Sequence, residues 1–166
     1  MMESASSSRA GMTWLCGLCS ATDLPSAAAC ESATFDEQIF REKLQKSTKK
    51  IKPFLLEQTL VAGLGNIYVD EVLWLAKIHP EKVANQLTES SIHLLHDSII
   101  EILQKAIKLG GSSIRTYSAL GSTGKMQDEL RVYGKTGEKC VRCGNEIQKI
   151  KVAGRGTHFC PFCQQK

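Results

Sequence analysis

The sequence predicts a mainly α-helical fold that ends in a small β-hairpin. Apolar residues recur at helical spacing in several stretches between residues 35 and 109, and the run Gly63-Leu64-Gly65-Asn66 separates two of them. After the helical part come two short apolar stretches around a glycine-containing turn, and a Cys-x2-Cys pair lies on either side of them. The pattern therefore favours a helical domain joined to a hairpin that cysteines hold together.

The chain has 166 residues, which is enough for one ordinary domain or two small ones. We expect a disordered or aberrant leader over residues 1–33, a helical domain over 34–128 and the hairpin over 129–166. The leader is rich in serine and has only a short, interrupted apolar run, so the alternative of a signal peptide is weaker. No stretch approaches the ~20 apolar residues that span a bilayer, and no membrane partner is expected.

The first helices are predicted from their start signals. Thr34 and Glu37 have the spacing of a capping box, and apolar residues follow them at helical intervals. A lysine-rich connector over residues 46–52 should separate this helix from the next one. Pro53 suits the first turn of that second helix, because its missing N–H is not needed there.

The run from Gly63 to Asn66 predicts a tight turn before a helix that starts at Ile67 and ends near His79-Pro80, with Asn66 as the N-cap. Glycines allow the backbone to approach a phosphate closely, and a helix N-terminus offers free N–H groups. The amide of Asn66 can also donate to a phosphate. The alternative is a plain corner between two helices with a capping asparagine.

A long helix is predicted from Thr88 to Leu109, where Gly110-Gly111 should stop it. His93 and His96 lie one turn apart on this helix, but no acidic or cysteine cluster accompanies them, so we interpret them as ordinary helix residues. The stretch over residues 112–126 is small and hydroxylic, and a loop of this length in a compact domain is usually functional or disordered.

The cysteine pairs Cys140-x2-Cys143 and Cys160-x2-Cys163 predict one structural Zn²⁺ ion. Each short turn directs two sulfurs at one point, and two such turns complete the closed tetrahedral thiolate cage that zinc prefers. Two unrelated cysteine pairs, or a pair of disulfides, are the alternatives. The segment is too short to bury much core, so we expect the metal to hold it folded.

Within the zinc segment we predict strands at residues 147–152 and 158–160, with a turn over 153–157. Arg155 then lies at the tip of the hairpin between two glycines, where a guanidinium can reach a charged groove. A further short strand is expected from Leu130 to Tyr133.

The net charge of +4 is concentrated at the C-terminal end, where the residues from Gly134 onward are strongly basic. A basic tail around a zinc hairpin indicates a polyanionic partner, although solubility alone is the simpler alternative. Three cysteines remain outside the zinc site, Cys16, Cys19 and Cys30. Thiolate zinc sites and leftover thiols are typical of a reducing cytosol.

These motifs resemble those of one known family. The run from Leu56 to Glu71 looks like the helix-two-turns-helix signature of bacterial formamidopyrimidine-DNA glycosylases, and Gly110 to Tyr117 resembles the start of their lesion-recognition loop. The segments 132–140 and 154–163 are similar to their zinc finger. The resemblance covers residues 34–166, which identifies the chain as similar to the C-terminal part of such an enzyme.

The resemblance implies excision of oxidised purines, such as 8-oxoguanine and formamidopyrimidine, followed by cleavage of the sugar–phosphate backbone. Asn66 and Arg155 are implied to contact backbone phosphate, and Arg155 is assigned to the δ-elimination step. The other implied DNA-binding residues are Gly63, Gly65, Arg115, Tyr117 and Lys125. The implied partner is double-stranded DNA, preferably damaged, bound by a monomer in the bacterial cytoplasm at the nucleoid.

One departure from the family concerns the nucleophile. The family attacks the sugar with an N-terminal proline that follows the initiator Met, whereas this sequence begins Met1-Met2-Glu3. We therefore expect a chain that binds DNA but is catalytically impaired, because positioning of the nucleophile supplies much of the rate. The alternatives are an active glycosylase and AP lyase when an N-terminal fragment complements it, or a zinc-dependent interaction protein that does not bind DNA.

Overall fold

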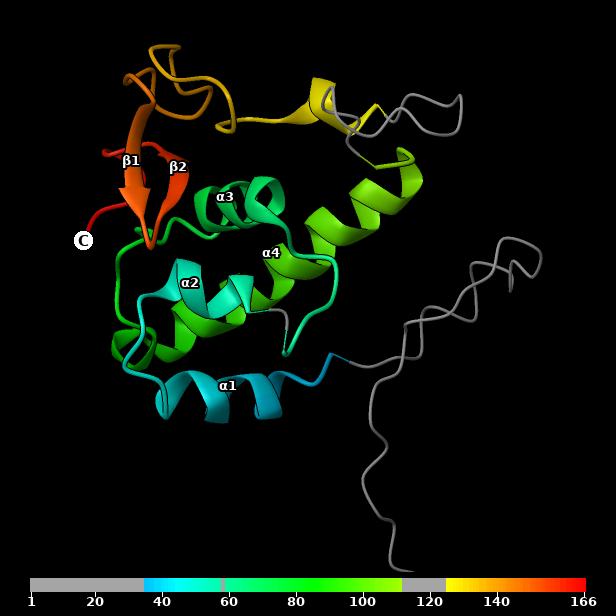
Figure 1. Ribbon diagram of the computed structural model, residues 1–166, viewed down its shortest axis with the longest axis vertical. Coiled ribbons are helices and arrows are strands. Elements are labelled where there is room, and N and C mark those ends of the chain that lie inside the picture. The colour runs from blue at the N-terminus through cyan, green and yellow to red at the C-terminus, as the bar shows by residue number, and fades with distance from the viewer. Residues whose placement is uncertain (1–34, 58, 112–124) are drawn as a thin grey trace, which may run out of the picture. The chain divides into compact units, whose positions relative to one another are not determined.

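The computed structural model describes residues 35–57, 59–111 and 125–166, and it is mainly α-helical with one small hairpin, as predicted (Figure 1). The leader 1–33 lies outside these residues. The helices are α1 (Glu37–Gln45), α2 (Ile51–Leu56), α3 (Asn66–Leu75) and α4 (Glu89–Lys108), with 3-10 turns η2 (Ala84–Gln86) and η3 (Met126–Glu129). The strands are β1 (Gln148–Val152) and β2 (Arg155–Phe159). No helix among the described residues is long and apolar enough to cross a membrane.

Helix α1 begins later than the predicted capping box. Its N-cap is Asp36, whose Oδ1 accepts hydrogen bonds from the backbone N–H groups of Gln38 (2.7 Å) and Ile39 (3.1 Å). Thr34 lies outside the described residues. A carboxylate at this position satisfies two free N–H groups and also interacts favourably with the positive end of the helix dipole.

The expected lysine-rich connector is shorter than predicted. Helix α2 already starts at Ile51, so Ile51 and Lys52 belong to its first turn together with Pro53. Both Ile51 and Lys52 are fully buried. The prediction placed Lys52 in a solvated connector, because a lysine in a polar run is normally exposed to water.

The core lies between α3 and α4. Buried residues of α3 and of the turn before it pack against the apolar stripe of α4, and Phe40 and Leu44 of α1 close the same cluster. Helix α4 has the predicted bounds: Thr88 caps it by accepting from Ser91 N (3.3 Å), and Gly110 follows it with φ of 71°. Figure 1 shows α4 passing behind α2.

The strand predicted from Leu130 to Tyr133 is not formed. Instead, the buried carboxylate of Glu71 in α3 accepts three successive backbone N–H groups, those of Arg131 (2.8 Å), Val132 (2.9 Å) and Tyr133 (2.9 Å). Burial raises the pKa of Glu71, although these bonds act in the opposite direction. The segment is therefore bound to α3 by a side chain, and its backbone donors are satisfied without a partner strand.

The hairpin has a tighter turn than predicted. Strands β1 and β2 pair antiparallel, with Val152 opposite Arg155, so only Ala153 and Gly154 lie in the turn. Both have positive φ, 47° and 79°, which is the conformation of the two-residue turns that match strand twist. Arg155 is consequently the first residue of β2 and not the tip.

Candidate nucleic-acid interface and metal centre

The four predicted zinc ligands come together beside the hairpin. The sulfurs of Cys140, Cys143, Cys160 and Cys163 all lie within 4.8 Å of one another, with Cys140–Cys163 at 4.0 Å and Cys143–Cys160 at 3.4 Å. Tetrahedral zinc with bonds of about 2.3 Å requires sulfur separations of about 3.8 Å. The set therefore fits one structural Zn²⁺ ion, and the alternative of two unrelated pairs is excluded.

The ionisation of these thiols also calls for a cation. A hydrogen bond from Asn145 lowers the pKa of Cys143 to about 6, whereas burial and the neighbouring thiols raise the pKa of Cys163 to about 12. Thiols this close resist joint ionisation unless a positive charge lies between them. Zinc holds all four as thiolates. Among the residues that the structure describes, no other group of side chains is arranged to hold a metal ion. His93 and His96 therefore do not form part of a metal site.

The first cysteine pair is anchored to the end of α3. The indole Nε1 of Trp74 donates to Sγ of Cys140 at 3.4 Å. The guanidinium of Arg142, between the two cysteines of this pair, lies 4.0 Å from the centre of the Trp74 ring and donates to the Trp74 carbonyl (2.9 Å). Local sequence patterns give no sign of these contacts, since 66 residues separate Trp74 from Cys140.

The second cysteine pair is anchored through Gln164, which is fully buried. Its side-chain oxygen accepts from the backbone N–H of Cys160 (2.8 Å), and its side-chain nitrogen donates to the carbonyl of Ile78 (2.9 Å). Both halves of the zinc site are thus fixed to α3 or to the chain that follows it. The hairpin consequently has a defined position on the helices.

The glycine-rich turn lies at the start of α3. Gly63 has φ of 91°, which only glycine adopts readily, and Gly65 is the N-cap. A Cβ atom at Gly65 would meet no other atom within 4 Å, so the space next to this residue is open. Asn66 is the first residue of α3 and not its cap, contrary to prediction. Its side chain is therefore available for another partner.

That partner is the hairpin. The side-chain nitrogen of Asn66 donates to the carbonyl oxygen of Gly156 (3.1 Å), and the ammonium of Lys52 donates to the same oxygen (3.1 Å). Gly156 directly follows Arg155, whose side chain is exposed. The fold thus brings Asn66 and the backbone beside Arg155 together, although the two residues lie far apart in the sequence.

A buried ion pair lies behind this contact. Lys52 and Asp70 are both fully buried, with 2.6 Å between the ammonium and Oδ1. The other oxygen of Asp70 accepts from the backbone N–H of His158 (2.8 Å). Burial lowers the pKa of Lys52, the Asp70 charge opposes that shift, and the nearby charge of Arg155 adds to it. Cationic groups from α2 and from β2 therefore lie near each other, and Asp70 balances the charge of Lys52.

The remaining predicted residues belong to the loop. Arg115 and Tyr117 lie outside the described residues. Lys125 is exposed at the start of η3, where its backbone N–H donates to the carbonyl of Leu109 at the end of α4 (2.9 Å). The structure therefore places one end of the predicted loop against α4.

Comparison with known proteins agrees with this geometry. A family model described as the formamidopyrimidine-DNA glycosylase H2TH domain matches residues 27–118, and a second, the zinc finger found in FPG and IleRS, matches 137–166. A formamidopyrimidine-DNA glycosylase of Lactococcus lactis subsp. cremoris is 91% identical over 132 residues, which is 80% of this chain and 48% of the relative. One from Streptococcus pyogenes serotype M3 is 59% identical over 134 residues, 80% of this chain and 49% of the relative.

Solved structures give the same result. A Lactococcus lactis FPG mutant, G226P, in complex with DNA that contains Fapy-dG matches with 90% identity and a TM-score of 0.77, over 80% of this chain and 49% of that one. The Lactococcus lactis protein in complex with abasic-site DNA matches with 91% identity and a TM-score of 0.76, over the same shares. The chain spans about half the length of the relatives that it matches.

Proposed function

The chain belongs to the formamidopyrimidine-DNA glycosylase family, and from this premise we propose that it is the DNA-binding part of a base-excision-repair glycosylase. One observation supports this most strongly: Asn66 and the backbone beside Arg155 meet at the carbonyl of Gly156. The N-terminus of α3, the amide of Asn66 and the exposed residue Arg155 are thereby held close together, and each of these groups can bind phosphate.

The ligand of this surface is the phosphate backbone of duplex DNA, preferably damaged. Relatives have been solved with DNA that contains Fapy-dG or an abasic site, so duplexes with these lesions or with 8-oxoguanine are the appropriate probes. Contacts to phosphate release counterions, and binding should therefore weaken steeply as salt increases. Recognition of the damaged base should be poor in these 166 residues alone.

We propose further that the chain alone has little glycosylase or AP lyase activity. Borohydride reduction traps the imine that this chemistry forms between an amine and the sugar. With an 8-oxoguanine duplex, we expect DNA binding in a mobility-shift assay but no trapped covalent adduct. An adduct formed by this chain alone would refute the impairment, and an adduct formed only after addition of an N-terminal fragment would show complementation.

A control separates this proposal from a zinc-dependent interaction protein. Asn66→Ala combined with Arg155→Ala should weaken DNA binding while the protein retains its zinc. Absence of binding by the parent chain, or equal binding by the double variant, would contradict the assignment.

A further inference from the structure

We propose that the buried Lys52–Asp70 pair is a positioning device, which orients the amide of Asn66 toward a phosphate through the carbonyl of Gly156. The inference rests on the proposed function and assigns roles to two residues that do not face the DNA themselves. It makes the phosphate contact of Asn66 depend on correct docking of the zinc hairpin.

The bond to Gly156 determines which atom of the Asn66 amide faces which partner. Only the nitrogen of the Asn66 amide can donate to the Gly156 carbonyl, so this bond of 3.1 Å fixes the orientation of the group. The amide oxygen is then enclosed, and it has no hydrogen-bond partner among the described residues. The nitrogen has a second N–H, which remains for an anion. In the reversed orientation the oxygen would face the anion and repel it.

The carbonyl of Gly156 is itself held in place by a second donor. Its oxygen also accepts from the ammonium of Lys52, and Lys52 reaches it from the start of α2 with no exposed surface. The ammonium is held on its other side by Asp70 at 2.6 Å. Lys52 is therefore confined between a carboxylate and a backbone oxygen. It can fix the position of Gly156 without contacting the ligand.

Strand β2 is held to the helices at a second point. Asp70 uses its second oxygen to accept from the backbone N–H of His158 at 2.8 Å, two residues beyond Gly156. Strand β2 is thus fixed to the helices at two alternate residues, once through its carbonyl and once through its N–H. Loss of either partner allows the strand to move relative to α3, and then the amide of Asn66 is free to reverse.

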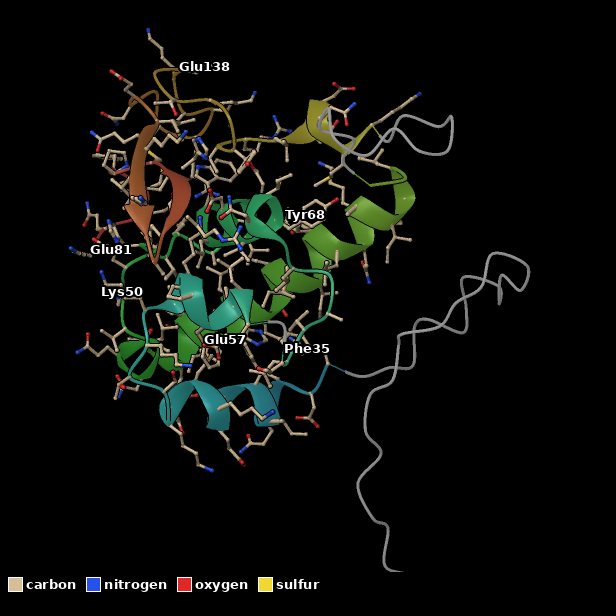
Figure 2. The ribbon with its side chains drawn as sticks, in the orientation of Figure 1. Phe35, Lys50, Glu57, Tyr68, Glu81 and Glu138 are labelled. Carbon is tan, nitrogen blue, oxygen red and sulfur yellow. The ribbon has the colours of Figure 1, made fainter. Side chains whose placement is uncertain are left out.

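The chain offers a matched control for this pair. Lys50 lies two residues before Lys52 and pairs with Glu81 at 2.7 Å, but its side chain is half exposed. Figure 2 shows Lys50 and Glu81 together at one edge of the molecule. Neutralising this pair removes the same charges from the same part of the chain without touching Gly156.

The decisive experiment is a thermodynamic cycle on the full chain. Asn66→Ala is introduced into the parent, into Lys52→Met with Asp70→Asn, and into Lys50→Met with Glu81→Gln, and affinity for an abasic-site duplex is measured by fluorescence anisotropy. In the parent and in the Lys50 background, Asn66→Ala should weaken binding about tenfold. In the Lys52 background it should weaken binding less than about twofold, because the amide is no longer oriented. An equal loss in all backgrounds would overturn the inference.

The Asp70→Asn substitution keeps a side-chain oxygen for the N–H of His158, and neutral replacement of both partners avoids an unpaired buried charge. Zinc content and the helical circular dichroism signal confirm that each variant is folded.

A second measurement needs neither a variant nor DNA. In the parent chain, one side-chain N–H proton of Asn66 should exchange with water more slowly than the other, because Gly156 holds it; equal, rapid exchange of both protons would refute the proposal. If the parent binds no DNA, the proposed function fails, while this exchange measurement still decides the orientation.

Discussion

The indole Nε1 of Trp74 lies 3.4 Å from Sγ of Cys140, so the last turn of α3 donates a hydrogen bond directly to a zinc ligand. An N–H donor to a thiolate disperses its negative charge and fixes the orientation of the ligand. The guanidinium of Arg142, which lies between the two cysteines of the first pair in the sequence, packs on the ring of Trp74. One helical side chain thereby links the metal site to the helical core.

Replacement of Trp74 by Phe tests that link. Phe retains an aromatic ring for Arg142 but lacks the N–H donor, and loss of a hydrogen bond to a metal ligand typically lowers affinity for the metal about 10-fold to 100-fold. We expect zinc to pass to a competing colorimetric chelator at correspondingly lower chelator concentrations. Trp14→Phe is the control for the generic effect of losing an indole. Equal zinc retention in both variants would show that the bond is not important.

Zinc removal should unfold the hairpin and spare most of the helices. The buried residues form two clusters: the larger comprises α1 to α4 without any cysteine, and the smaller comprises Trp74, Val132, Cys140, Ile147 and Cys160. Only the smaller cluster depends on the metal. Chelation should therefore change the fluorescence of Trp74, measured in a Trp14→Phe background, while the helical circular dichroism signal remains largely intact. Loss of the entire helical signal would indicate one joint core.

Local signals in the sequence predicted the parts that depend on local geometry. The Cys-x2-Cys spacing predicted the zinc cluster, because two residues between cysteines suffice to direct both sulfurs at one ion. The glycines at 110 and 111 predicted the end of α4, since positive φ is needed there. The turn before α3 was also predicted, but the N-cap of α3 is Gly65 and not Asn66 as expected.

What the sequence did not reveal depends on distant partners. Lys52 was interpreted as part of a solvated connector, yet its partners Asp70 and Gly156 lie 18 and 104 residues away. The segment after Leu130 has the composition of a strand, but Glu71 from 60 residues earlier satisfies its N–H groups. No local periodicity contains such information, so these errors follow from tertiary contacts that override propensity.

A pH-dependent contact joins α1 to α4. Nδ1 of His93 and Oε2 of Glu37 lie 3.1 Å apart, and this bond raises the pKa of His93 above 6.5 and lowers the pKa of Glu37 below 4.5. The contribution of His93 is fully present below pH 6.5 and is lost as the pH rises through its raised pKa. The contribution of Glu37 is present above pH 4.5 and is lost as the pH falls through its lowered pKa.

The contact is therefore strongest between pH 4.5 and 6.5. An NMR titration of the imidazole should show His93 titrating above 6.5, and Glu37→Gln should lower that value. Glu42→Gln, an exposed change on the same helix, is the control and should leave it unchanged. A midpoint that is the same in all three proteins would contradict the assigned pairing.

Single substitutions at the proposed phosphate site should differ in their salt dependence. Arg155→Ala removes a cation, so it should weaken DNA binding and also reduce the slope of log K against log salt by about one. Asn66→Ala removes a neutral donor, and it should weaken binding with little change of slope. Lys43→Ala, an exposed cation on α1, is the matched control for charge. A slope that falls equally for Arg155→Ala and Lys43→Ala would show that only general charge matters.

The burial of the Lys52–Asp70 pair predicts unequal effects of two neighbouring lysines on stability. Lys52→Met leaves the carboxylate of Asp70 buried without its cation, and loss of one partner of a buried pair costs about 3–5 kcal/mol of the free energy of unfolding. Lys50→Met breaks a half-exposed pair with Glu81, which is worth at most about 1 kcal/mol because water screens it. Urea denaturation of the zinc-loaded proteins measures both, and the midpoint should fall markedly only for Lys52→Met. Comparable midpoints for the two variants would mean that Asp70 is solvated or protonated in the folded chain.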